Sequence, residues 1–507
     1  MRYLIANAHI VTGADTFVGS VGVDGGLIVG VWRKEDKSFE EFAASAEDTI
    51  DATGLCLLAG GIDVHVHFRE PGMTHKGDIQ SESRAALLGG ITSYIDMPNT
   101  RPPTVSEAAL EEKLELAEGR SWADYGFHLG ATNSNLEEIL GADQEKYAGI
   151  KVFMGSSTGN MLVDKEEALG RIFQIKGKTI LIHSEDQGII EANLAKARAA
   201  YGDAIPFSAH PAIRSRLACI KSTAKALELA IKYGTRLHIC HVSTAEEVQM
   251  VRAAKIHNPL ISAETSVNYL WFCDEDYSRL GSMIKCNPAI KSAADREALI
   301  AGLAEGVIDS IGSDHAPHTA YEKGLAGVRG NTAEEKGLAK IGGNTIGENS
   351  RDYLSCPSGT VSVGEQLPVL FTIAAQTGMP LNRIASAISE RPAEIFGIAG
   401  KGFIKAGMEA DLVLVDPSEQ FIQGKPEYKC GWSPYEGEKL CGAVKAVFLH
   451  GEPVVKDGRM AGSPQGRRLS YSDEHETECT DYPTGQKSNC PTKISGEPGQ
   501  SNVEEGR

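Results

Sequence analysis

The chain has 507 residues, of which 41% are hydrophobic and 23% are charged, as is ordinary for a large globular protein. No stretch approaches the ~20 consecutive apolar residues that a membrane-spanning helix requires, so we expect no association with a membrane. The net charge of −18 argues against a nucleic-acid partner, because polyphosphate binding requires a basic surface.

The amino-terminal residues, MRYLIANAHIVTG, have neither a basic start nor a long apolar segment, so we expect no signal peptide. The ten cysteines are scattered along the chain and form no CxxC pair. Scattered cysteines of this kind are typical of reduced thiols in the cytosol. We therefore expect a cytoplasmic protein.

Residues 1–60 contain short strand-like runs separated by glycine, such as YLIANAHIV and SVGVDGGLIVGVW. A similar pattern returns in residues 398–470, in GFIKAGMEADLVLVD and AVKAVFLHGEPVVKDGRM. We expect these two segments, although far apart in the sequence, to pair in one small β-sandwich domain.

Residues 61–397 have a different pattern, in which apolar strand-like runs alternate with helical stretches. The strand-like runs are TSYIDMP, GIKVFMG, TILIHSE, RLHICHVS and VIDSIGSDH, and the helical ones include SEAALEEKLELAE and IKSTAKALELAIKYG. Alternation of this kind predicts parallel βαβ units. The fold class is therefore α/β, with a (β/α)8 TIM-like barrel, although the eight strands cannot be counted individually from the sequence.

Two further segments differ from the rest. Residues 321–355 are rich in glycine and only weakly periodic, which predicts an insertion that either decorates the surface or covers the site. Residues 471–507 contain few apolar side chains and many Ser, Thr, Gly and Glu. Such a tail cannot bury enough surface to offset its chain entropy, so we expect it to be disordered.

The strand-like runs of the barrel end in side chains that bind metals. His65 and His67 lie two residues apart in IDVHVHFREPG, so they share one face of a strand. In a parallel barrel the catalytic groups lie at the carboxyl ends of the strands. The same position in later runs holds Lys151, His183, His241 and Asp314. Four histidines and one carboxylate suit a borderline metal such as zinc.

Each of these residues also has a simpler interpretation. A single histidine at a strand end is more often a hydrogen-bonded core or surface residue, and His238 competes with His241 for the same role. A free Lys151 ammonium would be repelled by metal ions, whereas reaction with carbon dioxide would make it a carbamate that can bridge two of them. Alternatively, Lys151 pairs with a nearby carboxylate, and the spacing alone does not choose between these possibilities.

The motifs together resemble cyclic amidohydrolases of the amidohydrolase superfamily, and among them the dihydroorotases of bacterial type. The resemblance covers most of residues 1–470. The motifs that carry it are HVHFREPG (65–72), DMPNT (96–100), GIKVFMGSSTGNM (149–161), IHSED (182–186), CHVST (240–244), KCNPAIKS (285–292), SDHAPH (313–318), PSG (357–359), RPAEIFGI (391–398), GMEADLVLVD (407–416) and WSPYEG (432–437).

The resemblance implies a (β/α)8 barrel with a small β-sandwich built from both termini. It implies two zinc ions per chain. One would be held by His65, His67, Lys151 and Asp314, and the other by Lys151, His183 and His241, with Lys151 carboxylated on its side-chain nitrogen. This ligand set favours His241 over His238. We also expect a homo-oligomer, of which a dimer is the simplest form.

The family reaction is the reversible closure of carbamoyl-aspartate to dihydroorotate in pyrimidine biosynthesis. Two zinc ions would lower the pKa of a shared water toward ~7, and Asp314 would act as general base and then general acid. Arg69 can bind the substrate carboxylate with its two-donor fork, and Asn99 can add an amide donor. The resemblance adds Asn287 and His318 as contacts to the substrate ring.

Several alternatives remain open. Arg69 could instead form a surface ion pair with Glu70 or Asp78. Allantoinases share the metal ligands but tend to carry asparagine at the position of Arg69, and dihydropyrimidinases do not share HFREPG. A non-catalytic relative would typically have lost metal ligands. The family often has two histidines where this chain has Asn268 and Tyr269, and the insertion is longer than the resemblance predicts.

Overall fold

The computed structural model of the protein describes residues 1–36, 38–155, 161–325, 338–341, 344–347 and 352–472. The predicted disordered tail therefore lies outside the described residues, apart from its first two positions. Within the predicted insertion, β15 (Leu338–Ile341) and β16 (Asn344–Gly347) form an antiparallel pair, and the greater part of the remainder lies outside the described residues.

In the described part of the chain, parallel strands occupy eight successive positions of a barrel. They are β6 (Gly61–Val66), β7 (Ile91–Asp96), β8 (Asp124–Phe127) continued by β9 (Leu129–Gly130), β10 (Gly149–Phe153), β11 (Thr179–His183), β12 (Leu237–Ile239), β13 (Ile261–Thr265) and β14 (Ser310–Ile311). The ring closes just beyond β14, where the Asp314 amide donates to the His65 carbonyl at 2.9 Å and the His67 amide donates to the His315 carbonyl at 2.8 Å. The predicted (β/α)8 barrel is confirmed.

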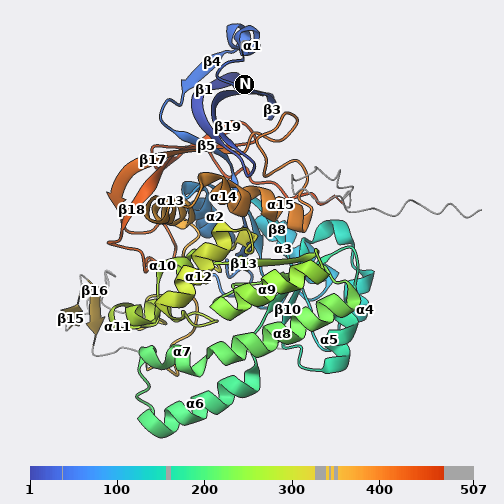
Figure 1. Ribbon diagram of the computed structural model, residues 1–507, viewed down its shortest axis with the longest axis vertical. Helices are drawn as coiled ribbons and strands as arrows, with labels where there is room; N and C mark the ends of the chain where they lie inside the picture. Colours follow the sequence, from blue (N-terminus) through green and yellow to red (C-terminus); the bar gives the residue numbers. More distant parts are fainter. Residues whose placement is uncertain (37, 156–160, 326–337, 342–343, 348–351, 473–507) are drawn as a thin grey trace, which may run out of the picture. The chain divides into compact units, whose positions relative to one another are not determined.

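Helices connect the barrel strands, and neighbours such as α8 and α9 lie side by side (Figure 1). The helices that follow β6 are α2 (Ile79–Leu88), α3 (Glu107–Ala117), α4 (Leu136–Gly141), α5 (Glu166–Ile172), α6 (Gln187–Tyr201), α7 (His210–Ile213), α8 (Arg216–Tyr233), α9 (Ala245–His257), α10 (Val267–Trp271), α11 (Tyr277–Leu280), α12 (Ala293–Ala304), α13 (Gln366–Thr377), α14 (Leu381–Ala385) and α15 (Arg391–Phe396).

The longest of these, α8, illustrates how the sequence makes a barrel helix. Its buried residues recur every three or four positions, as in Ser222, Ala226 and Ala230, so one face packs against the barrel. The helix ends at Gly234, which takes the left-handed conformation with φ of +60° that glycine adopts at little cost.

Residues 2–59 and 412–460 contribute the strands of a second, mostly antiparallel sheet, drawn in blue and orange in Figure 1. Its strands are β1 (Arg2–Val11), β2 (Thr16–Asp24), β3 (Leu27–Arg33), β4 (Asp48–Asp51), β5 (Cys56–Ala59), β17 (Leu412–Ile422), β18 (Lys439–Leu449), β19 (Glu452–Lys456) and β20 (Arg459–Met460), with the short helix α1 (Phe39–Ser45) between β3 and β4. The pairing of β5 with β17 joins the amino-terminal and carboxyl-terminal segments, as predicted.

The barrel strands are buried along their whole length, as expected for a parallel sheet covered by helices. The terminal sheet has its own cluster of buried apolar residues, which includes Ile5, Val21 and Leu412. The exact boundaries of the domains stay predictions. After β20 the chain returns to the barrel, where the Leu469 amide donates to the Tyr125 carbonyl at 2.8 Å.

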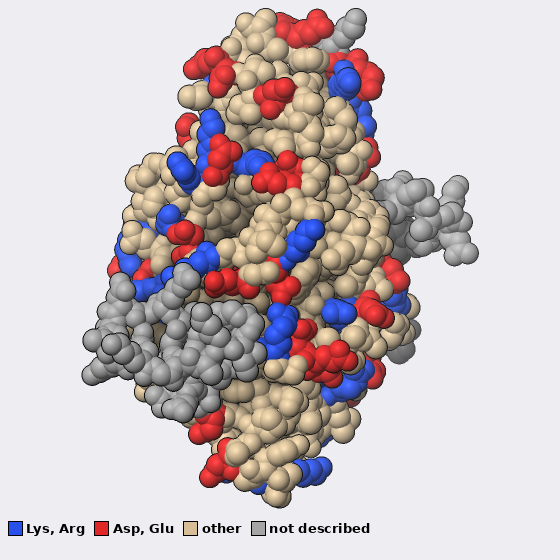
Figure 2. All heavy atoms as spheres, turned by 90° about the vertical axis from the view of Figure 1, so that its left-hand side faces the viewer, with Lys and Arg blue, Asp and Glu red and all other residues tan. Residues whose placement is uncertain are grey.

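The surface and cysteine predictions can be compared with the described residues. No helix among them has both the length and the apolar character needed to cross a membrane. On the face shown in Figure 2, Lys and Arg side chains are interspersed with Asp and Glu rather than gathered into a basic patch. The eight described cysteines are buried and form no disulfide with one another.

Candidate metal centre

The residues predicted to form the site line one cavity of about 410 Å³ at the carboxyl ends of the barrel strands. These strands lie far apart in the sequence, and only barrel closure brings their ends together. The predicted residues that line this cavity are His65, His67, Arg69, Asn99, Lys151, His183, His241, Asn287, Asp314 and His318. The structure therefore gathers all ten, while their individual roles stay predictions.

The first group of candidate ligands surrounds the Asp314 carboxylate. Oδ1 of Asp314 lies 3.4 Å from Nε2 of His65 and 3.1 Å from Nε2 of His67. Both histidines are buried and project from the end of β6. One carboxylate oxygen and two ring nitrogens therefore converge on one small volume, as the ligands of a zinc ion do.

The second group consists of His183, at the end of β11, and His241, just beyond β12. Nδ1 of His183 lies 3.0 Å from Nε2 of His241. The His241 ring is also 5.2 Å from the His65 ring, measured between centroids, so the two groups are adjacent. This arrangement places a second set of nitrogen ligands beside the first.

Three of the four histidines are held by a hydrogen bond at the ring nitrogen opposite the one that faces the other candidate ligands. Nδ1 of His65 contacts Glu264, Nδ1 of His67 donates to Asn99 Oδ1 at 2.8 Å, and Nε2 of His183 donates to Glu185 Oε2 at 2.9 Å. A donor fixed on one side of an imidazole leaves the lone pair of the other nitrogen facing the metal site. The donor set therefore fits a metal centre.

The charge state of these rings also fits metal binding. Burial lowers the pKa of His67 to about 4 and lowers the pKa values of His183 and His241, so all three rings are neutral at pH 7. His65 differs: burial disfavours its charged form, but the neighbouring Glu264 outweighs this and raises its pKa to about 10. A metal on Nε2 of His65 must therefore displace a proton.

Asp314 is ionised. Burial alone would raise its pKa, but the imidazoles of His65, His67 and His241 outweigh burial and hold the pKa well below the usual value. The carboxylate is therefore available as a ligand or as a proton acceptor at neutral pH. Of the two roles, ligation is the one that the contacts with His65 and His67 favour most directly.

Lys151 is fully buried in β10. Its Nζ lies 3.0 Å from Sγ of Cys240 and 5.2 Å from the centroid of the Phe153 ring. Within the described residues it forms no ion pair with a carboxylate, so the simple pairing considered from the sequence is not found there. A buried amine without an anionic partner fits conversion to a carbamate.

Backbone strain also gathers at this cavity. Arg69, His241 and Asp314 have φ values of +70°, +39° and +49°, a region that residues other than glycine rarely occupy. Strained backbone persists where the surrounding structure enforces it, and such positions cluster at functional sites. The strain is consistent with side chains that are held in fixed positions for ligand binding.

Arg69 is buried beside the two candidate metal histidines. Its Nε donates to the Pro317 carbonyl at 3.0 Å, and its Nη2 lies 3.2 Å from Nε2 of His318. The surface ion pairs considered from the sequence are not formed, because Glu70 pairs with Arg120 and Asp78 pairs with Lys429.

Other predicted contacts to substrate differ in their surroundings. Oδ1 of Asn287 is buried at the cavity and has no hydrogen-bond partner among the described residues. Burial lowers the pKa of His318 to about 3, so its ring is neutral, and Nδ1 lies 3.1 Å from Nζ of Lys76. Asn99 supports His67, a role that the sequence did not indicate.

Four nearby polar residues have hydrogen-bond partners that do not line the cavity. His238 contacts Ser262 and Glu264, and His315 contacts Glu82, so neither imidazole lines the cavity. At the two positions where the sequence departs from the expected family pattern, Asn268 accepts from the Tyr435 hydroxyl, and the Tyr269 hydroxyl donates to the Pro288 carbonyl.

Sequence reasoning missed the two carboxylates that orient ligands, Glu185 and Glu264. Glu185 lies two residues after His183 in IHSED and also pairs with the buried Arg214. Glu264 lies near the end of β13, at a position equivalent to that of the ligands on other strands. Its place at a barrel strand end was a signal in the sequence that could have identified it.

Comparisons with known proteins agree with this geometry. Residues 56–454 match the profile of the Amidohydrolase family. A dihydroorotase of Methanosarcina acetivorans is 33% identical over 472 residues, which cover 88% of this chain and 94% of the relative. An allantoinase of Deinococcus radiodurans is 29% identical, covering 92% of this chain and 98% of the relative.

Among solved structures, an L-hydantoinase (dihydropyrimidinase) from Arthrobacter aurescens superimposes with a TM-score of 0.81 and 26% sequence identity. The match covers 92% of this chain and 99% of that structure. Matches of this extent span both the barrel and the terminal sheet. The chain therefore belongs to the amidohydrolase family, and the cyclic amidohydrolase group predicted from its motifs is confirmed.

Proposed function

We propose that the protein is a zinc-dependent dihydroorotase, which reversibly closes N-carbamoyl-L-aspartate to (S)-dihydroorotate and water. The relatives divide between dihydroorotases and allantoinases, so the residues of the cavity, rather than the family, distinguish the substrates. The candidate substrates differ most in charge, since dihydroorotate carries a carboxylate and allantoin does not. A site for dihydroorotate therefore needs a cationic side chain that can bind this carboxylate.

The observation that carries the proposal is the environment of Arg69. The guanidinium is buried, and its two hydrogen-bond contacts in the cavity wall are to uncharged groups, the Pro317 carbonyl and the neutral His318 ring. Burial lowers the pKa of Arg69 to about 10, which still leaves it charged at pH 7. A buried cation beside a reaction centre is costly unless an anion binds it, and a carboxylate matches its two-donor fork.

Two zinc ions fit the donor set. His65, His67 and Asp314 would hold one, His183 and His241 the other, and the carbamate form of Lys151 would bridge them. When bound, the zinc ions supply Lewis acidity toward an amide carbonyl and make a water molecule acidic enough to ionise near neutral pH. The buried position of Lys151, with no carboxylate partner among the described residues, supports the carbamate.

Asp314 would transfer the proton. In the ring-opening direction its carboxylate takes a proton from the attacking water and gives it to the ring nitrogen as the carbon–nitrogen bond breaks. In the ring-closing direction the same carboxylate takes the proton from the carbamoyl nitrogen and returns it to the departing water. The low pKa of Asp314 supports this role, because it leaves the carboxylate ionised and able to accept a proton at the start of each cycle.

The remaining contacts would orient the substrate. Arg69 binds the carboxylate, and Asn287 supplies an amide whose buried oxygen has no partner in the described residues. His318 lies between Arg69 and Lys76 and can contact the ring, whereas Asn99 acts through His67 and can also contribute its amide nitrogen.

One assay tests this proposal. Zinc-loaded protein is given carbamoyl-aspartate, dihydroorotate, allantoin and dihydrouracil side by side. We expect turnover of the first two to exceed that of the others by at least ~10²-fold, since a lost pair of charged hydrogen bonds is on the scale of 3 kcal/mol. Preferential turnover of allantoin would replace the proposal with an allantoinase. The absence of turnover with all four would favour a non-catalytic relative.

Three further predictions belong to this proposal. A dihydroorotase would act in pyrimidine biosynthesis, and we keep the prediction of a cytoplasmic enzyme because the eight described cysteines are unpaired thiols. We also keep the prediction of a homo-oligomer, a dimer being the simplest form. Light scattering of the purified protein measures the oligomeric state directly.

A further inference from the structure

One charged residue of the cavity wall, Lys76, has no part in the reaction described above. It follows the HFREPG motif in the segment between β6 and α2, and its side chain is 13% exposed. Nζ of Lys76 lies 3.1 Å from Oε1 of Glu322 and 3.1 Å from Nδ1 of His318. The lysine therefore contacts a carboxylate, which favours its charged form, and an imidazole that also lines the cavity.

The His318 ring meets a hydrogen-bond donor at each of its nitrogens. Nζ of Lys76 faces Nδ1, and Nη2 of Arg69 lies 3.2 Å from Nε2. Burial lowers the pKa of His318 to about 3, so the ring is neutral at pH 7. A neutral imidazole accepts a hydrogen bond at one nitrogen and donates at the other. Only one of the two cations can therefore donate to the ring, and the other meets an N–H group.

The Ser358 carbonyl distinguishes the two forms of the ring. Its oxygen lies 3.1 Å from Nε2 of His318 and can only accept, so it favours a proton on Nε2. The Lys76 ammonium has three donors and no lone pair, so it favours an unprotonated Nδ1. One form of the ring satisfies both contacts, and in that form Nε2 carries the proton.

The opposite form would need an acceptor at Nδ1. Glu322 offers one, but its Oε2 lies 3.6 Å from Nδ1 of His318, which is beyond hydrogen-bond distance. The same oxygen already accepts from the Thr319 amide at 3.0 Å. The opposite form would also set the Lys76 ammonium against an N–H group. The contacts therefore favour the form with the proton on Nε2.

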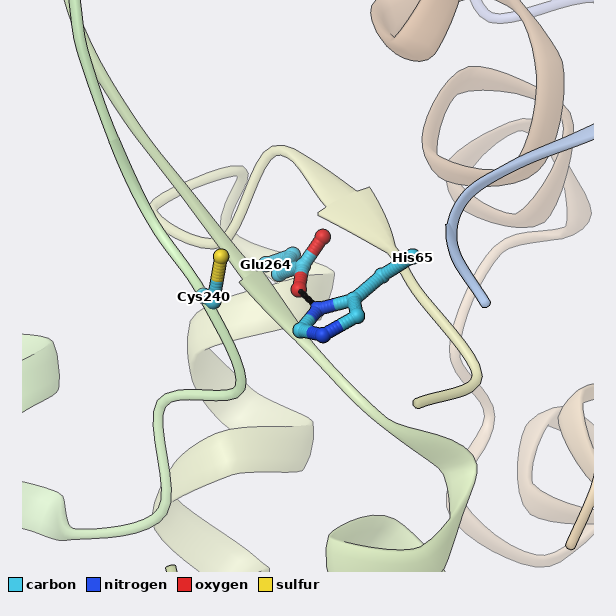
Figure 3. Close-up of side chains that lie close together, drawn as sticks. All are labelled: His65, Cys240 and Glu264. Carbon is cyan, nitrogen blue, oxygen red and sulfur yellow. Dashed lines mark hydrogen bonds and ion pairs between the residues drawn. The ribbon is translucent and has the colours of Figure 1, made fainter. Parts of the chain in front are cut away.

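The histidines of the candidate metal centre are held in the opposite sense. Glu264 accepts from the His65 ring, as Figure 3 shows, and an acceptor at one ring nitrogen leaves a lone pair on the other. At His318 the group that holds the ring is a donor, so the other nitrogen is left as an N–H group. Such a nitrogen can neither bind a metal ion nor accept from Arg69.

We propose that Lys76 is a positioning residue for substrate binding, which keeps His318 from accepting a hydrogen bond from Arg69. Because Lys76 occupies the lone pair of Nδ1, Nη2 of Arg69 stays available to the substrate carboxylate together with Nη1. The inference rests on the proposed function, which assigns the carboxylate to Arg69. Glu322 supports the arrangement by holding the Lys76 ammonium in place.

Nitrogen NMR of the histidine rings measures the position of the proton. The whole zinc-loaded protein carries isotopically labelled histidine, and spectra are recorded without substrate, because the chemical shift of a ring nitrogen reports whether it bears a proton. The signals of His318 are identified by their loss in His318→Gln. We expect Nε2 of His318 to be protonated and Nδ1 to be unprotonated. Lys76→Met should abolish or reverse this pattern, whereas Lys76→Arg restores a charged donor and should keep it.

The kinetic consequence should be confined to substrates that carry a carboxylate. Lys76→Met should lower kcat/KM for dihydroorotate by about 10- to 100-fold, through a higher KM, because one charged hydrogen bond of Arg69 is diverted to His318. Turnover of dihydrouracil should hardly change. Lys225→Met, which removes a lysine paired with Glu166 on the surface, is the matched control and should retain both the nitrogen pattern and the wild-type KM.

A proton on Nδ1 of His318 in the wild-type protein would overturn the inference. A wild-type nitrogen pattern in Lys76→Met would also overturn it, and a raised KM in that variant would then mean that Lys76 binds the substrate directly. Wild-type protein with the expected pattern but no turnover of dihydroorotate would overturn the proposed function, and with it the role of Lys76 toward the carboxylate. The position of the ring proton would stand in that case.

Discussion

Nε2 of His183 lies 2.9 Å from Oε2 of Glu185, and the opposite nitrogen of the same ring faces His241 at 3.0 Å. The carboxylate thereby fixes which nitrogen of His183 carries the proton. Glu185 is in turn held by the buried Arg214. An acidic side chain that is not part of the cavity lining is thus well placed to set the orientation of one candidate ligand.

Glu185→Ala should therefore weaken binding of the zinc ion that His183 would hold, by about 10- to 100-fold. This is the usual effect of removing the hydrogen-bond acceptor that orients a metal-bound histidine. Glu185→Gln keeps an oxygen acceptor and should weaken binding less. Competition with a chelator measures the affinity. Glu191→Gln, on the exposed face of α6, is the control. Unchanged affinity in folded Glu185→Ala would show that His183 needs no such support.

Lys151→Ala should lose bound zinc and turnover together, because the variant lacks the group that would bridge the two ions. Short carboxylic acids added to the variant should restore part of both, since they supply a similar anion. Elemental analysis and turnover are measured on the same samples, with the exposed Lys196→Ala as control. Normal zinc content in Lys151→Ala would refute a bridging role.

Asp314→Asn should keep the fold, because the amide has nearly the same shape as the carboxylate that contacts His65 and His67. Turnover should fall by at least ~10²-fold, the scale of general acid–base catalysis. Comparing kcat at matched zinc content separates the loss of the proton acceptor from the loss of a ligand. A near-normal kcat would exclude Asp314 from proton transfer.

Glu365 makes stability depend on pH. Burial raises its pKa to about 7, although the Tyr428 and Ser433 hydroxyls that donate to it act in the opposite direction. Below the unfolded pKa of 4.5 both states hold the proton, and between 4.5 and about 7 only the folded state does. The free energy of unfolding therefore decreases as pH rises through this window, because ionising the buried Glu365 is unfavourable. The decrease is at most about 3 kcal/mol.

Glu365→Gln removes this loss. The free energy of unfolding of the variant, minus that of wild type, should therefore be larger at pH 8 than at pH 5. Urea unfolding at the two pH values measures this difference. Glu115→Gln, on the exposed face of α3, should show no such gain. An equal difference between Glu365→Gln and wild type at the two pH values would contradict the raised pKa.

Local patterns in the sequence predicted the barrel and most of the ten cavity residues, whereas Asn287 and His318 were expected only from the family resemblance. His65 and His67 share a strand face, and Lys151, His183, His241 and Asp314 follow apolar runs, so parallel strands place them at one end. Glu185, Glu264 and the supporting contact of Asn99 were not predicted as orienting groups. Their roles depend on which ring nitrogen they face, and that follows from side-chain positions that no local pattern encodes.

The same limit applies to the alternatives for Arg69. Its nearest carboxylates in the sequence, Glu70 and Asp78, made a surface ion pair plausible. In the structure they pair with Arg120 and Lys429, residues 50 and 351 positions away from their partners. Long-range pairing of this kind forms only when the folded chain brings distant segments together, and Arg69 is left lining the cavity.

The central claim, that Arg69 binds the substrate carboxylate, is tested most directly by Arg69→Leu with two substrates. Losing a two-bond fork should lower kcat/KM for dihydroorotate by about 10²- to 10⁴-fold, at roughly 1.5–3 kcal/mol per charged hydrogen bond. Turnover of dihydrouracil, which lacks the carboxylate, should hardly change, and zinc content should stay normal. An equal loss for both substrates would mean that Arg69 maintains the site itself, and would contradict its role in reading the substrate.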